Sequence, residues 1–175
     1  AAAVKIDAFA YMPVQDFGNA FSTFIAQNYG AKQNDRIRSG LKSAVLISVA
    51  FCVVLSTLVC AFAKPLMLLF VDAGETEILL EGVRYLHIEG SFYCGIGCLF
   101  LLYGLYRALG KPGMSVVLTV ISLGTRVALA YLLSSLPSIG VTGIWWSVPI
   151  GWALADFVGF VYYKKKINLY DGSQP

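Results

Sequence analysis

The feature that most constrains the fold is a series of five long apolar stretches. A bilayer core about 30 Å thick is crossed by roughly 20 apolar residues in a helix. In this chain of 175 residues, 58% are hydrophobic and 13% are charged, whereas a typical soluble domain carries about 25% charge. The predicted fold class is therefore all-α, a polytopic transmembrane helical bundle. Its predicted spans are residues 6–27, 41–63, 82–106, 114–136 and 141–163.

Basic residues gather on one side of this predicted bundle. Nine of the thirteen lysines and arginines lie at the inner boundaries of the spans, three of them in the run Lys164–Lys166. The opposite side has only Lys64 and Arg84 in its connecting loops. Cytoplasmic loops carry the excess of basic residues. We therefore predict a multi-pass protein of the cell (inner) membrane, with a cytoplasmic C-terminus and a cytoplasmic tail at 167–175.

The predicted topology begins outside and has an odd number of spans. The chain opens AAAVKIDAFAY, which reads as the interior of an apolar helix. We therefore expect a fragment of a longer protein, with at least one further helix upstream.

Four charged residues stand out well inside the apolar spans: Asp16, Glu89, Arg126 and Asp156. A charge at the centre of a bilayer costs about 2.5–3.5 kcal/mol on insertion scales and commonly marks a functional position. For Asp156 the sequence favours packing, with its carboxylate paired to a lysine or arginine on the inner side.

A polar stripe runs along the first span. Gln15, Asp16 and Asn19 recur at helical spacing, one turn after Pro13. This pattern predicts a cation or substrate site, the alternative being a polar helix contact that only stabilises the bundle.

Two further candidates come from the third and fourth spans. Glu89 and Tyr93 lie one helical turn apart, so a carboxylate and an aromatic ring could face lipophilic cations together. Counted from the outer ends of their spans, Arg126 and Asp16 lie at similar depth, about 15 Å. The best-matched partner for Arg126 is therefore Asp16, with a partner on a helix upstream of this chain as the equal alternative.

The chain has no motif for catalysis. Walker, dinucleotide, nucleophile-elbow and zinc-ligand patterns are all missing, and the four cysteines lie inside apolar stretches at packing positions. We expect no enzyme, no cofactor, no metal site and no nucleic-acid partner.

Three motifs together resemble the C-terminal lobe of the multidrug and toxic compound extrusion (MATE) family. They are FIAQNYGAKQNDRI at the end of the first span, YRALGKPGMS after the third, and GVTGIWWSVPIGWALAD in the fifth. The resemblance covers about Ile6 to Lys166. It implies a twelve-helix transporter of two lobes, in which residues 1–166 form part of the C-terminal lobe and match helices 8–12.

The resemblance also implies a function. Members are antiporters that export organic, often cationic, compounds in exchange for Na⁺ or H⁺ by alternating access. The implied partners are the bilayer, the N-terminal lobe and small organic cations. In some members a carboxylate of the C-terminal lobe falls near Ile96, about two turns inward of Glu89. Two alternatives stay open: a lipid-linked oligosaccharide flippase of a related branch, and a non-transporting membrane scaffold.

Overall fold

A computed structural model describes residues 2–137 and 139–166, and these residues form helices and turns with no strand. The helices are α1 Ala2–Gly30, α2 Asn34–Ala61, α3 Ala63–Leu68, α4 Thr76–Gly90, α5 Tyr93–Ala108, α6 Pro112–Ser134 and α7 Thr142–Lys166. The predicted all-α class is confirmed. The predicted cytoplasmic tail at 167–175 lies outside the described residues.

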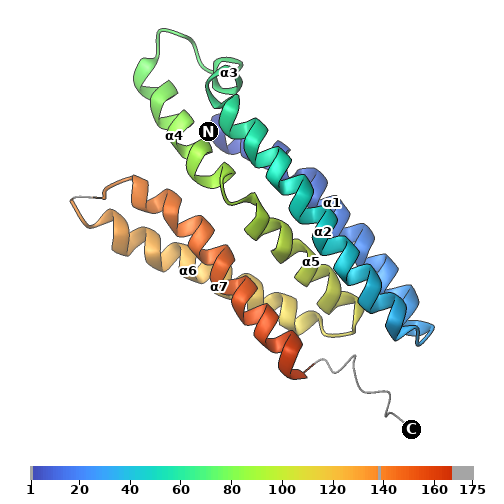
Figure 1. Cartoon of the computed structure of the whole chain (residues 1–175). Helices are drawn as coiled ribbons and strands as arrows, with labels where there is room; N and C mark the ends of the chain where they lie inside the picture. Colours follow the sequence, from blue (N-terminus) through green and yellow to red (C-terminus); the bar gives the residue numbers. More distant parts are fainter. Residues whose placement is uncertain (1, 138, 167–175) are drawn as a thin grey trace.

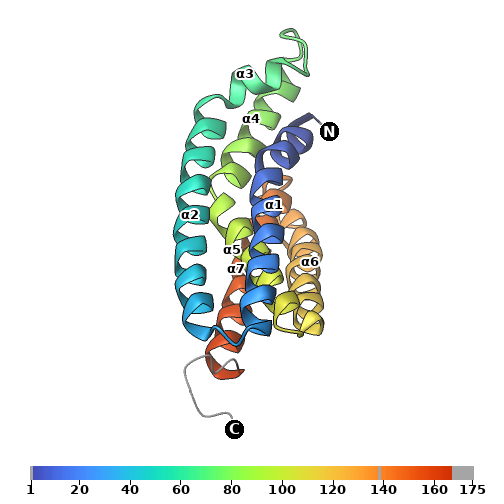
Figure 2. The same cartoon turned by 90° about the vertical axis from the view of Figure 1, so that its right-hand side faces the viewer.

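The helices form two antiparallel pairs with a central element between them. α1 lies beside α2, α6 lies beside α7, and α5 packs against all four (Figures 1 and 2). The α1–α2 and α5–α6 turns lie at one end of the bundle, together with the end of α7, whereas α3 and the N-terminus lie at the other. The segments rich in basic residues therefore share one end.

The third predicted span is not one continuous helix. α4 ends at Gly90, α5 begins at Tyr93, and the two helices are bent by 51°. Ser91 sits at the break, where its hydroxyl donates to the carbonyl of His87 at 2.6 Å. A Gly-Ser pair is a common cause of sharp helix bends. The loop predicted before this span also contains a helix, the short α3.

The five predicted spans differ in whether their helices are long and apolar enough to cross a membrane. Among the described residues, α2, α6 and α7 are long and apolar enough to cross a membrane, and the bent α4–α5 pair makes a fourth. α1 has 29 residues and continues through Pro13, so its length of about 43 Å is sufficient. The polar stripe of α1 lowers its mean hydropathy, and α1 is not among the helices that are apolar enough. That α1 crosses the membrane therefore stays a prediction.

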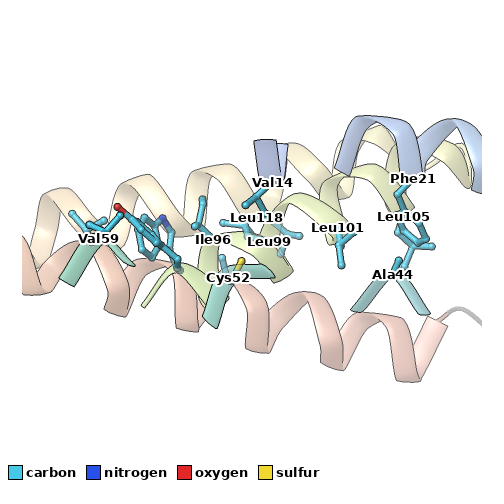
Figure 3. Close-up of a cluster of buried hydrophobic side chains, with 14 of the residues drawn as sticks. Val14, Phe21, Ala44, Cys52, Val59, Ile96, Leu99, Leu101, Leu105 and Leu118 are labelled. Atoms are coloured by element: carbon cyan, nitrogen blue, oxygen red, sulfur yellow. The ribbon is translucent and has the colours of Figure 1, made fainter. Parts of the chain in front are cut away.

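The apolar interior lies where α1, α2 and α5 meet. Val14 and Phe21 of α1 pack with Cys52 of α2 and with Leu99 and Leu105 of α5 (Figure 3). All four cysteines are free, and Cys52 is buried. Large apolar side chains on the outward faces of α2 and α6 are exposed, which suits contact with lipid.

Glycines let α1 and α5 approach closely. A Cβ atom built on Gly104 would lie 2.6 Å from the carbonyl oxygen of Gly18. One built on Gly18 would lie 3.0 Å from the carbonyl oxygen of Phe100. Small residues at a helix crossing allow the backbones of membrane helices to touch. This crossing fixes the distance between α1 and α5, which are two of the helices that carry the candidate site.

Gly104→Ala is expected to destabilise the bundle. The added methyl group meets backbone rather than a movable side chain, and overpacking of this kind costs about 1–3 kcal/mol. Gly124→Ala is the matched control, because nothing lies within 4 Å of its Cβ position on α6. Thermal unfolding of the full-length protein, followed by reaction of the buried Cys52 with a thiol dye, should show a lower midpoint for the first variant only. Equal midpoints would contradict the tight crossing.

Candidate cation and substrate site

The structure places Glu89 and Tyr93 beside a carboxylate that the sequence analysis did not select, Asp7. Asp7 lies on α1, Glu89 in the last turn of α4 and Tyr93 at the start of α5. Both carboxylates are only 4% exposed and Tyr93 is 0% exposed. Two acidic groups from distant parts of the sequence are therefore buried together near the N-terminal end of the bundle.

Hydrogen bonds satisfy this acidic pair only in part. The hydroxyl of Tyr85 donates to Oδ2 of Asp7 at 3.4 Å. Asp7 also interacts electrostatically with Glu89 and Tyr93. Yet Oδ1 of Asp7 and the phenol oxygen of Tyr93 form no hydrogen bond within the part of the chain described. Buried polar atoms without partners are costly, and such atoms lining one cluster are suited to a bound ligand.

Arg126 belongs to this cluster rather than to Asp16. It is half-buried on α6, and its charge acts on both Asp7 and Glu89. The predicted Asp16–Arg126 pair is wrong, since the one ion pair within 4.0 Å among the described residues is Arg84–Glu81. Asp16 and Arg126 were expected at equal depth in the membrane, but equal depth does not make two side chains face each other.

We call Asp7, Tyr85, Glu89, Tyr93 and Arg126 the outer cluster. An aromatic wall extends it, because the ring of Tyr85 meets Trp145 of α7 edge-on, with centroids 6.1 Å apart. When all three groups are ionised, two carboxylates and one guanidinium give the cluster a net negative charge and more hydrogen-bond acceptors than the guanidinium can satisfy. Such a site attracts a cation, either an inorganic ion held by oxygen atoms or an organic ammonium ion among aromatic rings.

The polar stripe of α1 divides between two surroundings. Gln15 and Asn19 line an open pocket of about 250 Å³, and Asp16 does not. Oδ1 of Asn19 accepts a hydrogen bond from Nη2 of Arg107 at 2.8 Å. Asp16 is exposed. The structure therefore separates Asp16 from the other two candidates, although all three share one helix.

Asp156 forms no ion pair within 4.0 Å among the residues that the structure describes. Its Oδ1 atom is buried without a hydrogen bond from any described residue, and its other oxygen lies 3.9 Å from the Cβ position of Gly95. The expected pairing with an inner lysine or arginine is wrong. α7 packs Asp156 against α5, and Lys164 instead lies over the ring of Phe160, 4.7 Å from its centroid.

One sequence signal could have identified Asp7. It repeats in register with Val14, Gly18, Phe21 and Ile25, which are among the other buried positions of α1. Intervals of three, four and seven residues mark one face of a helix. A carboxylate on the face that carries the core side chains was therefore visible in the sequence.

Comparison with known proteins agrees with this architecture. The model of the MatE family matches residues 1–132. Two curated relatives from Bacillus subtilis (strain 168) are "Probable multidrug resistance protein YoeA", 26% identical over 94% of this chain, and "Probable multidrug resistance protein YpnP", 27% identical over 91%. The chain spans 36% and 35% of the lengths of these relatives.

Solved structures share the fold. An inward-facing and an outward-facing conformation of a multidrug resistance MATE family transporter each align with a TM-score of 0.89 and 20% identity. The alignments cover 98% and 97% of this chain and 40% and 38% of the solved chains. With a family match over residues 1–132 and a multi-pass helical bundle of this topology, the chain belongs to the MATE family of membrane transporters.

Proposed function

We propose that the full-length protein exports organic, often cationic, compounds in exchange for Na⁺ or H⁺, and that the outer cluster binds the coupling cation. The observation that carries this proposal is the burial of Asp7 next to Glu89, with Arg126 nearby. Charged groups inside membrane helices are costly and face a pathway or a partner. An antiporter needs such a site, because its cation must leave water and be held temporarily by protein atoms.

The position of the cluster also suits alternating access. Its residues come from α1, α4, α5 and α6, so a cation bound here would contact helices from both sides of the bundle. Tyr85 and Tyr93 add phenol oxygens that can replace part of a hydration shell. Displacement of that cation by an organic cation at overlapping positions would give exchange.

The proposal includes the place of this chain in the transporter. Residues 1–166 form part of the C-terminal lobe, matching helices 8–12, and the N-terminal lobe is the partner that completes the path. The bundle lies in the cell membrane, and its end with the excess of basic residues faces the cytoplasm. The names of the relatives favour an exporter over the flippase and scaffold alternatives.

A gradient-driven assay tests this function. The full-length protein in proteoliposomes should export ethidium when a Na⁺ gradient or a pH gradient is imposed, and not when both are absent. Glu89→Gln should reduce this export about tenfold or more, since a charge-assisted contact contributes about 1.5–3 kcal/mol. Glu81→Gln is the matched control on the same helix, because Glu81 is exposed and bonded to Arg84. Export that is independent of both gradients would contradict the proposal.

A further inference from the structure

A second polar site lies well away from the outer cluster. The pocket of about 250 Å³ noted above is lined by polar side chains of three helices, namely Gln15, Asn19, Arg107, Ser115 and Thr119. Asn19 lies twelve residues after Asp7 on α1, which separates the two sites by about 18 Å along the helix. We call this second site the inner pocket.

The inner pocket is basic. Arg107 lies in the last turn of α5. It donates from Nη2 to Asn19 at 2.8 Å and from Nε to the carbonyl of Tyr103 at 3.4 Å. No carboxylate lies within 4.0 Å of it among residues 2–137 and 139–166. A guanidinium has five N–H donors in a planar fork. The N–H groups of Arg107 that do not bond to its described neighbours are available to an acceptor group of a ligand.

The rest of the pocket supplies an aromatic wall and neutral polar groups. The rings of Phe100 and Tyr103 line it and lie 6.4 Å apart, tilted by 63°. The hydroxyls of Ser115 and Thr119 donate to backbone carbonyls at 3.3 Å and 3.0 Å, so their remaining lone pairs act as acceptors. Pockets that enclose whole drug-sized ligands measure about 300–1,000 Å³. This smaller pocket fits one substituted ring of a larger compound.

From this geometry we propose that the inner pocket binds the anionic group of an aromatic zwitterion, with Arg107 holding its carboxylate or sulfonate. The inference rests on the proposed export function and assigns to this pocket the part of an exported compound that carries a negative charge. Asn19 fixes the guanidinium from α1, and the rings of Phe100 and Tyr103 pack against the aromatic body. The outer and inner sites then have opposite charge preferences.

A pair of dyes isolates the anionic group. Rhodamine B has a free carboxylate, and rhodamine B ethyl ester has the same ring system without that charge. Binding of each dye to the full-length protein is measured by fluorescence anisotropy in a neutral detergent. Arg107→Gln should weaken binding of rhodamine B about tenfold, because a charge-assisted contact is lost, and should change binding of the ester less than twofold.

Two further variants keep the test specific. Arg107→Lys retains the charge and should restore most of the preference for the acid over the ester. Lys111→Gln removes a nearby positive charge that lies over the ring of Tyr162 rather than in the pocket, and it should leave both dyes unaffected. An equal loss for both dyes in Arg107→Gln would show that Arg107 only links α1 to α5, and would overturn the proposal. So would unchanged binding of both dyes.

Lipid is the other source of an anionic group on an apolar body. Displacement of rhodamine B by phosphatidylglycerol, but not by phosphatidylcholine, would assign the pocket to a lipid headgroup and overturn its assignment to an exported compound. The binding assay needs no ion gradient. A failure of gradient-driven ethidium export, with the acid-over-ester preference intact, would therefore reject the proposed function and leave the anion-binding pocket standing.

Discussion

Asp7→Asn is expected to abolish most gradient-driven export. Asparagine has the shape of aspartate and its oxygen can still accept from Tyr85, so the local fold should persist. The negative charge that offsets the desolvation of a bound cation is lost. A charge-assisted contact of about 1.5–3 kcal/mol corresponds to roughly a 10- to 100-fold loss of cation affinity. Ethidium export from proteoliposomes should fall by a similar factor at subsaturating cation.

The matched control for Asp7 is Asp16→Asn. Both changes remove one carboxylate from α1, but Asp16 is exposed and lies outside the outer cluster. Its variant should export at nearly the normal rate. Equal losses in the two variants would contradict the assignment, since burial beside Glu89 distinguishes the two residues.

A double variant tests whether Asp7 and Glu89 form one site. If both hold the same cation, Asp7→Asn with Glu89→Gln should lose little more export than the stronger single variant. Effects of residues in contact are not additive, whereas distant and independent sites add. Fully additive losses would indicate two separate roles.

Arg126→Gln is expected to act in the opposite direction on cation affinity. The guanidinium is a fixed positive charge near Asp7 and Glu89, so it opposes the binding of a second cation. At an effective dielectric constant near 20, unit charges about 4 Å apart interact by about 4 kcal/mol, and Arg126 lies farther than that from both carboxylates. Removing the charge should therefore tighten cation binding, on the order of tenfold. The maximum export rate should fall, because release slows.

The measurement is export as a function of the coupling cation, either Na⁺ concentration or pH. For Arg126→Gln the half-saturating concentration should fall, which for H⁺ means a midpoint at higher pH. Arg84→Gln removes a charge from an exposed ion pair on α4 and serves as the control. A higher half-saturating concentration in Arg126→Gln would show instead that the guanidinium helps to build the site.

In the proposed function the outer cluster must bind a cation and then release it. Two buried carboxylates alone would bind a cation tightly and release it slowly. The neighbouring Arg126 would lower that affinity without filling the site, because it forms no ion pair within 4.0 Å of either carboxylate among the described residues. Transport requires a site that binds and then releases its cation, and an intermediate affinity serves both steps.

The sequence predicted the class of fold well because that class follows from local properties. In a membrane, a run of about 20 apolar residues can satisfy the hydrogen-bonding groups of its backbone within the segment only as a helix. Turn residues such as those of LGKPG mark the ends of helices without reference to the rest of the chain. The sequence did not predict the break between α4 and α5, because Gly90 and Ser91 are also tolerated within a continuous membrane helix. Whether a helix bends at such a pair is decided by the helices packed around it.

By itself the sequence determined that this chain is a bundle of apolar helices, that its basic residues share one end, and that the charged Glu89 and Arg126 occupy costly positions. Each of these conclusions depends on one residue type and its neighbours along the chain. Only the tertiary structure decided which polar groups meet. α1, α4 and α5 bring Asp7 to Glu89 across 81 intervening residues. The same packing turns Asp16 away from Arg126, since facing sides of helices depend on rotation about their axes and not on depth.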